Sequence, residues 1–283
     1  ARATARRPLA WASAWEAVTS LGESARESAL LLRAGLCNLA PSRFVDARGD
    51  AVLLCRAPAL DADLPFLDRL AELSRLAIER LAPQLPTPPQ ALLLALPARL
   101  ADEQGRLDDA GRAAVGVLRR QLPRGWDQLA IEVFPQGAPA AAWALRRALQ
   151  RLPRDGVLLW GCVDTLHDAG VLTELEGGDR LLRPDQVDGM RPGEAAAFVA
   201  LGARAVEGAV GLLACGFGDD ETAADEVTLD AALTASLTGA LAPLRALGAR
   251  CNQWLLGSSH EEVATRALQN LIGRCGDVLG TAT

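Results

Sequence analysis

The stretch RPGEAAAFVAL, residues 191–201, marks the place where the organisation of the chain changes. Before it, apolar segments typical of buried strands alternate with amphipathic segments of helical periodicity. From within it, two short apolar runs, AAAFVALG (195–202) and AVGLLACGFG (209–218), follow each other with no helical segment between them. The alternation predicts an α/β protein with a largely parallel central sheet, and the two successive runs predict neighbouring antiparallel strands.

The segments on either side of this stretch have clear periodic signals. Apolar character predicts strands at 11–22, 50–57, 91–98, 127–137 and 155–166. Amphipathic periodicity predicts helices at 23–35, 66–85, 106–122 and 138–153. After a loop-rich stretch, 172–194, and the two short runs, the pattern resumes with a helix at 228–248, a strand at 252–257 and a helix at 259–273. Ser259 and Glu262 form a capping-box pattern at the start of the last helix.

Composition narrows the class of protein. The 283 residues are 50% hydrophobic but only 4% aromatic, so we expect a core of Ala, Leu and Val in closely packed helices and strands. The net charge is −6, and all 29 basic residues are arginine, with no basic stripe. An acidic chain of this kind is a poor binder of nucleic acid or of an anionic membrane. No apolar run reaches the roughly 18 residues that a membrane-spanning helix needs.

The cysteines and histidines predict neither a metal site nor a disulfide framework. Six cysteines stand at positions 37, 55, 162, 215, 251 and 275, none of them in a CxxC pair, and His167 and His260 are the only histidines. This spacing lacks the ligand pattern of a zinc site. Several cysteines lie within apolar runs, where they act as small buried side chains. We therefore expect a cytoplasmic protein that carries no metal and no cofactor.

Four stretches resemble, in the same order along the chain, motifs of the β-ketoacyl synthase branch of the thiolase superfamily. The most specific is RPGEAAAFVAL, which is similar to a PGEGAAFLVL segment of that family. The other three are AVTSLGESARESALLLRAGLCNLAPSRF (17–44), VLLWGCVDTL (157–166) and TRALQNLIGRCGDVLGTAT (265–283). Each motif alone is weak, and the joint match over nearly the whole chain carries the resemblance.

This resemblance implies a fold of two similar mixed α/β halves packed in α-β-α-β-α layers. On that basis residues 1–170 are expected to form an N-terminal half, 171–224 a connecting loop with a central hairpin, and 225–283 part of a C-terminal half. The chains of that family run on past the turn that GDVLGTAT (276–283) resembles. The C-terminal half is therefore expected to be incomplete, and the native chain is expected to continue beyond Thr283.

The resemblance also implies where catalytic groups belong, because the family's condensing enzymes use a cysteine at a helix N-terminus and two histidines. The cysteine belongs in the turn within FPQGAPAAAWAL (134–145), where Gly137 or, as we assign it, Ala138 fills its place and no Cys, Ser or Thr is present. Gln136, slightly earlier, is similar to the glutamine that chain-length-factor subunits carry in this slot. Leu256 stands at the position of the first histidine and Asp277 at that of the second. All three catalytic positions are thus expected to be lost.

Three further features offer alternative sites. Cys162, Asp164 and His167 lie in the sequence CVDTLH, in which a nucleophile and a base stand close together, although Cys162 belongs to a predicted buried strand. His260 falls in the first turn of the last predicted helix, where a solvent-facing side chain is the simpler interpretation. The acidic run GFGDDE (216–221) is either a set of cation ligands or a solvated loop, and the absence of further spaced acids favours the loop.

These observations lead to one functional hypothesis and two alternatives. The hypothesis is a non-catalytic ketosynthase-like protein that acts as a protein-binding adaptor or accessory factor. It resembles thiolase-like proteins associated with type VI secretion effector loading in Gram-negative bacteria. The alternatives are a 3-oxoacyl-carrier-protein synthase-like acyltransferase and a chain-length-factor-like partner of an active ketosynthase.

The resemblance also bears on partners. The family dimerises through a central strand of each subunit, so we expect a homodimer or a heterodimer with a related synthase subunit. An adaptor would in addition bind an effector or a secretion component. An open tunnel at Ala138 would favour a retained acyl-binding role, and a filled one would favour the adaptor.

Overall fold

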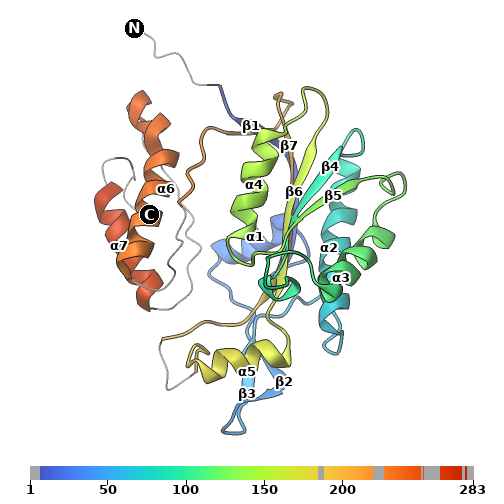
Figure 1. Ribbon diagram of the computed structural model, residues 1–283, viewed down its shortest axis with the longest axis vertical. Coiled ribbons are helices and arrows are strands. Elements are labelled where there is room, and N and C mark those ends of the chain that lie inside the picture. The colour runs from blue at the N-terminus through green and yellow to red at the C-terminus, as the bar shows by residue number, and fades with distance from the viewer. Residues whose placement is uncertain are drawn as a thin grey trace. The chain divides into compact units, whose positions relative to one another are not determined.

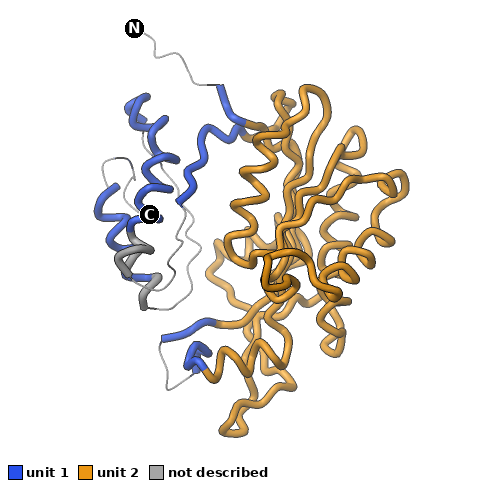
Figure 2. Tube along the Cα trace, in the orientation of Figure 1, with its two compact units in different colours: residues 1–9, 178–190, 211–283 blue, residues 10–177, 191–210 orange. Residues whose placement is uncertain are grey.

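The computed structural model describes residues 7–183, 188–218, 226–249, 251, 262–275 and 278. The chain divides into two compact units, which Figure 2 shows in different colours. The larger unit consists of Ala10–Gly177 and Arg191–Val210, and the smaller unit of Ala1–Leu9, Gly178–Met190 and Gly211–Thr283. Among the described residues, no helix is both long enough and apolar enough to cross a membrane.

A mixed β-sheet organises the larger unit (Figure 1). Its strands lie in the order β5 (Ala130–Phe134), β4 (Ala91–Ala95), β6 (Leu158–Thr165), β7 (Glu194–Gly202) and β1 (Ala10–Thr19). β4 is parallel to both β5 and β6, whereas β7 is antiparallel to both β6 and β1. The predicted α/β class is confirmed. The prediction of a largely parallel sheet is wrong at β7, which runs opposite to both of its neighbours, whereas β1 runs in the same direction as β4, β5 and β6.

The predicted hairpin between 195–202 and 209–218 is also wrong. β7 lies between β6, with Glu194 opposite Thr165, and β1, with Ala195 opposite Thr19. The second run forms only the short strand β8 (Val210–Leu212), which is not a neighbour of β7. Strands from earlier in the chain occupy both edges of β7. The entropic cost of closing a loop grows only slowly with its length, so a distant strand can displace an adjacent one.

Helices cover both faces of this sheet (Figure 1). The helices of this unit are α1 (Ala25–Arg33), α2 (Phe66–Leu81), α3 (Asp109–Gln121), α4 (Ala140–Gln150) and α5 (Ala169–Gly177), with short 3₁₀ turns η1 (Ala82–Gln84) and η2 (Ala98–Leu100). α2 contacts β1, β6, β7 and α3, whereas α4 contacts β4, β5 and β6. On β6, the indole N–H of Trp160 donates to the carbonyl oxygen of Ala141 in α4 at 3.0 Å. The preceding Leu159 packs into the core with α2 instead, as alternation along a strand requires.

Two elements differ from the sequence-based expectation. α5 occupies part of the stretch expected to be a loop, and its side chains Leu172 and Leu175 are buried. β2 (Ala40–Val45) pairs antiparallel with β3 (Ala51–Leu54), although only the second strand was expected. Proline and arginine within APSRFV hide the apolar alternation of β2, because proline is uncommon in strands except at edges.

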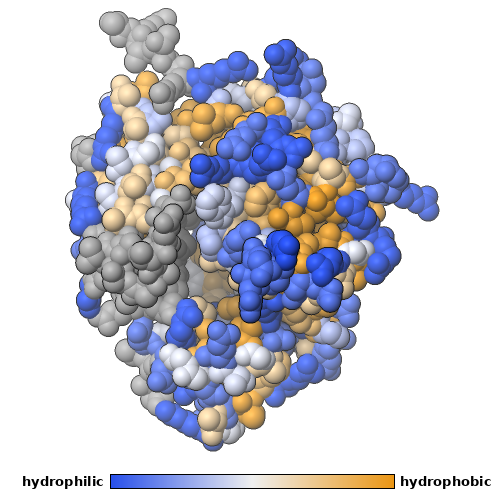
Figure 3. All heavy atoms as spheres, in the orientation of Figure 1, coloured by the Kyte–Doolittle hydropathy of each residue, from blue (hydrophilic) through white to orange (hydrophobic). Residues whose placement is uncertain are grey.

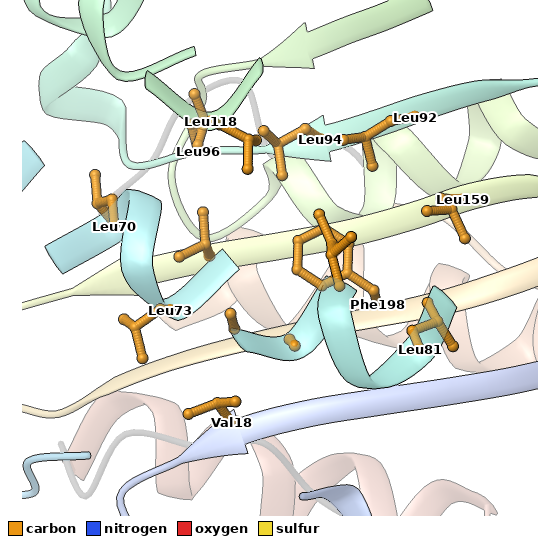
Figure 4. Packing of buried hydrophobic residues seen from close by; sticks show 14 of the residues in the cluster. Val18, Leu70, Leu73, Leu81, Leu92, Leu94, Leu96, Leu118, Leu159 and Phe198 are labelled. Atoms are coloured by element: carbon orange, nitrogen blue, oxygen red, sulfur yellow. The ribbon is translucent and has the colours of Figure 1, made fainter. Parts of the chain in front are cut away.

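The hydrophobic core of the larger unit lies between the sheet and α2 (Figure 4). Phe198 of β7 is fully buried among aliphatic side chains that include Leu159 and Leu81. Gly161 on the neighbouring β6 lies opposite Phe198, and a Cβ at Gly161 would stand 2.1 Å from Cδ1 of the phenylalanine ring. Only glycine at position 161 therefore allows the ring to lie this close to β6.

The smaller unit contains the helices α6 (Glu226–Leu247) and α7 (Glu262–Cys275), which pack against each other. Leu241, Cys275 and Val278 are buried in a small core of their own. The hydroxyl of Ser236 on α6 donates to the carbonyl oxygen of Gly216 at 2.9 Å. The strand predicted at 252–257 and the predicted capping residue Ser259 lie outside the described residues.

We expect Gly161→Ala to lower the free energy of unfolding of the larger unit by about 1–3 kcal/mol, because its methyl group overlaps the Phe198 ring. Urea denaturation followed by tryptophan fluorescence measures this change. Gly177→Ala is the control, because nothing lies within 4 Å of a Cβ at the end of α5. Equal stability of the two variants would contradict the packing argument.

Candidate functional site

A buried ion pair holds the start of β7. Glu194, from the RPGEAAAFVAL stretch, accepts two hydrogen bonds from Nη1 of Arg69 on α2, at 3.0 Å to Oε1 and 3.2 Å to Oε2. The side chain of Arg69 is 0% exposed and that of Glu194 is 1% exposed. Burial lowers the pKa of Arg69, and the facing charge of Glu194 opposes this shift. Removing either partner would leave an uncompensated charge in the interior, which costs roughly 3–5 kcal/mol.

Further hydrogen bonds satisfy other polar atoms of this pair. The carboxylate accepts from the backbone N–H of Ala57 and from the hydroxyl of Thr165, both at 2.9 Å. Nη2 of the guanidinium donates to the carbonyl oxygens of Asp61 at 2.6 Å and Ala62 at 3.1 Å. The network therefore joins α2, the end of β6, the start of β7 and the 57–62 loop.

Beside this network, a cavity of about 520 Å³ lies in the larger unit, where β4 and β6 end and β7 begins. Most of its walls are small apolar side chains such as Ala95, Ala138 and Ala197. Its polar lining comes from Thr19, Ser20, Cys162, Asp164 and Glu194. The carboxyl ends of parallel strands are the usual place for a ligand in an α/β sheet.

Ala138 lines this cavity from the turn between β5 and α4. The preceding Gly137 has φ +68°, its N–H donates to the carbonyl oxygen of Leu96 at 3.1 Å, and a Cβ on it would lie 3.1 Å from Cβ of Ala98. This glycine holds the turn against the end of β4 and presents the next residue to the cavity, just before the N-terminus of α4. Gln136 is exposed and does not line the cavity. At residue 138, which the resemblance in sequence predicts to be the nucleophile position, the turn therefore offers only a methyl group.

The other two positions that correspond to catalytic histidines, Leu256 and Asp277, lie outside the described residues, as does His260. Their convergence with Ala138 on one site stays a prediction. Residues 219–221, the acidic part of GFGDDE, also lie outside. Among the described residues, no cluster of three or more His, Cys, Asp and Glu side chains is placed to hold a metal ion.

The structure separates the histidine of CVDTLH from its cysteine. Cys162 and Asp164 line the large cavity, whereas His167 lines a different and smaller one. Burial, followed by the nearby Asp164, raises the pKa of the Cys162 thiol. Burial also raises the pKa of Asp164, opposed by the backbone N–H of Thr165 and the charge of Arg99. Since the thiolate is the reactive form, these shifts act against a nucleophilic role for Cys162.

The sequence did not reveal the Arg69–Glu194 network. Arginine within an amphipathic helix is normally assigned to the exposed face. The available signal is position: Leu70, Leu73 and Ala77 flank Arg69 on the buried face of α2, and Glu194 precedes an apolar strand. An acid and a base that both fall at predicted core positions indicate a buried pair.

Comparison with known proteins supports a fold assignment. No protein-family model and no curated protein matches the chain. A structure of a ketosynthase in complex with its chain length factor from Xenorhabdus doucetiae has a TM-score of 0.61 at 16% identity, over 93% of this chain and 76% of that one. A type II polyketide synthase acyl-carrier protein in complex with its ketosynthase has a TM-score of 0.67 at 12% identity, over 96% and 78%.

A third structure, the ketosynthase from module 6 of the bacillaene synthase of Bacillus subtilis, has a TM-score of 0.59 at 12% identity, over 94% of this chain and 55% of that one. The chain thus spans between about half and four fifths of the length of these proteins. Together the mixed sheet, the covering helices and these likenesses define a thiolase-like α/β fold. More particularly, it is the fold of the ketosynthases and their chain length factors, as the resemblance in sequence implied.

We expect Arg69→Met to lower the free energy of unfolding by about 3–5 kcal/mol, because Glu194 is left charged and buried. In a double-mutant cycle with Glu194→Gln, measured by urea denaturation, the double variant should lose less than the sum of the single losses. Arg204→Gln is the control, since Arg204 and Asp155 form an ion pair whose side chains are 70% and 78% exposed. Additive losses at Arg69 and Glu194 would contradict the coupling.

We expect a cysteine placed by Ala138→Cys to react with iodoacetamide at pH 8 faster than Cys162, which lines the same cavity. The introduced thiol stands before the N-terminus of α4, which favours a thiolate, whereas burial and Asp164 disfavour one at Cys162. Peptide mass spectrometry of alkylated sites measures both rates in one sample. Faster reaction at Cys162 would contradict the assignment of position 138 as the activated slot.

Proposed function

We propose that this chain is a non-catalytic ketosynthase-like protein that acts as an accessory factor or adaptor by binding other proteins. The observation that carries the proposal is the methyl side chain of Ala138 at the cavity, on the turn where condensing enzymes hold their nucleophile. Cys162 in the same cavity does not replace that nucleophile, because its raised pKa keeps the thiol protonated.

The cavity itself favours a second candidate, a chain-length-factor-like partner of an active ketosynthase. Its volume of about 520 Å³ is within the range of small-molecule sites, and its apolar walls suit an acyl chain. One of the similar structures contains a ketosynthase bound to its chain length factor. An accessory subunit that admits part of a growing chain is consistent with an open cavity beside a position that has no nucleophile.

Features of the surface support a protein partner. Hydrophilic residues project over much of the larger unit in Figure 3, with hydrophobic residues visible between them. Two large aromatic side chains, Trp15 on β1 and Trp143 on α4, are 45% and 42% exposed, and tryptophan is enriched in interface hot spots. Among the strands that the structure describes, β5 lies at the end of the order, and no described strand pairs with its outer edge. We propose that this edge forms a homodimer or a heterodimer with a related synthase subunit.

Effector loading in type VI secretion is the setting that we propose for the adaptor form of this function. In that setting the partner is an effector or a secretion component, and the cavity has no substrate role. The two candidates therefore differ in what binds and in whether an acyl chain occupies the cavity.

We expect the purified chain to take up no acyl group from an acyl-acyl-carrier protein above background, because the methyl group of Ala138 cannot form an acyl-enzyme intermediate. A radiolabelled acyl substrate, with the label counted on the precipitated chain, measures this self-acylation. An active ketosynthase and its Cys→Ala variant provide the positive and background controls. Labelling that Cys162→Ala abolishes would overturn the non-catalytic proposal.

We expect the chain to form a defined complex in size-exclusion chromatography with light scattering when it is mixed with a protein encoded beside its own gene. A one-to-one complex with a ketosynthase supports the chain-length-factor-like role, and a complex with an effector supports the adaptor. A monomer that binds neither kind of protein would contradict both.

A further inference from the structure

A second, smaller cavity of about 100 Å³ lies in the larger unit, beside the β2–β3 hairpin. Ser42 and Arg43 line it from β2, Arg56 from the segment after β3, Asp63 from the loop before α2, and His167 from the segment after β6. It shares no lining residue with the cavity at Ala138. Its volume accommodates a group of a few heavy atoms rather than a whole drug-sized ligand.

Of the two arginines that line this cavity, Arg43 has an ion-pair partner and Arg56 has none among the described residues. Arg43 forms an ion pair with Asp63, with 2.6 Å between Nη1 and Oδ1, and both side chains are largely exposed. Arg56 makes no ion pair with any residue that the structure describes, and its carbonyl oxygen accepts a hydrogen bond from the Asn38 side chain. The guanidinium of Arg56 therefore brings a positive charge to the cavity wall without a protein anion to balance it.

The acid whose charge acts on His167, Asp168, already has other partners. Asp168 forms an ion pair with Arg99, with 3.0 Å between Oδ1 and Nη1, and its Oδ1 also accepts from the N–H groups of Gly170 and Val171. The negative charge of Asp168 opposes the lowering of the His167 pKa. Asp63 balances Arg43 and Asp168 balances Arg99, so the positive charge of Arg56 is left over at the cavity.

The positive charges around this cavity act on the protonation of His167. Its ring packs edge-on against Phe44, with 5.3 Å between ring centroids, and its Nδ1 is buried without a hydrogen-bond partner among the described residues. Burial lowers the pKa of His167 to about 4, helped by the charges of Arg69, Arg56 and Arg43 and opposed by Asp168. The ring is therefore neutral at neutral pH, and its protonation is sensitive to any anion that enters.

We propose that this small cavity binds an oxyanion, a phosphate or carboxylate group, through the guanidinium of Arg56 with that of Arg43 beside it. A guanidinium presents paired N–H donors that match the oxygens of either group. The bound anion offsets the charge of the arginines and draws Arg43 away from Asp63. This site is independent of the large cavity and does not rest on the proposed function.

The test uses the full chain and its two histidines, whose ring signals His260→Gln assigns in a proton–carbon correlation spectrum. Inorganic phosphate and sodium difluoroacetate, a carboxylate that stays ionised near the pKa of His167, are titrated separately at constant ionic strength, with sodium chloride as the reference salt. We expect a saturable rise of about one in the pKa of His167, because an anion favours the protonated ring. The probe that saturates at the lower concentration identifies the preferred group.

Arg56→Gln should weaken the binding of that probe about tenfold or more, since it removes the charge-assisted hydrogen bonds. Arg26→Gln, which changes an exposed arginine on α1, is the matched control and should bind as the parent does. A shift of the same size in sodium chloride, or equal binding by the Arg56 and Arg26 variants, would overturn the proposal.

Acid unfolding could precede the titration of His167, so a second measurement is made at neutral pH. Here the rise in melting temperature that the preferred probe produces over chloride is compared between the parent and Arg56→Gln. We expect a rise that depends on probe concentration in the parent and is lost in the variant. An equal rise in melting temperature in both proteins would indicate general stabilisation by salt and would contradict the proposed site.

Discussion

The larger unit depends on one interaction, the buried ion pair between Arg69 and Glu194. Two opposite charges with almost no exposure are stabilised when they meet at hydrogen-bond distance and other polar groups bind their remaining atoms. Here the hydroxyl of Thr165 and the backbone of residues 57–62 supply these further hydrogen bonds, while Nε of Arg69 has no partner among the described residues. A displacement of α2, of the end of β6 or of the start of β7 would break several of these contacts at once, so the pair fixes the three elements jointly.

Side-chain packing also holds β7 in place. Four residues after Glu194, Phe198 covers Gly161, and the ring has room only because β6 carries no side chain there. Charge therefore holds one end of β7 and packing holds its middle. Because Thr165 and Gly161 both belong to β6, these two constraints also favour the observed register between β7 and β6. The RPGEAAAFVAL stretch contributes both constraints.

Local signals in the sequence predict local structure well. The amphipathic period of residues 66–85 locates α2, and the apolar runs locate β4, β6 and β7. The place of β7 between β6 and β1 is not predictable from such signals, because strand pairing depends on edges that other parts of the chain supply. At the site, the turn between β5 and α4 identifies Ala138. The cavity around it and the partnership of Arg69 with Glu194 come only from tertiary packing, which brings together residues 125 positions apart.

Glu194 and Ala138 both line the large cavity, but they differ in burial and therefore in how much the fold depends on them. Glu194 lies in both the ion pair and the cavity wall, so the shape of the wall is tied to the free energy of folding. Ala138 is exposed on its turn, and the φ of +68° at Gly137 and the hydrogen bond to Leu96 set the path of that turn. The side chain at position 138 can therefore change at almost no cost to folding, whereas the acid of the RPGE stretch cannot. On the proposed assignment of position 138, a methyl group there is compatible with a stable cavity wall, because the fold of the turn does not depend on that side chain.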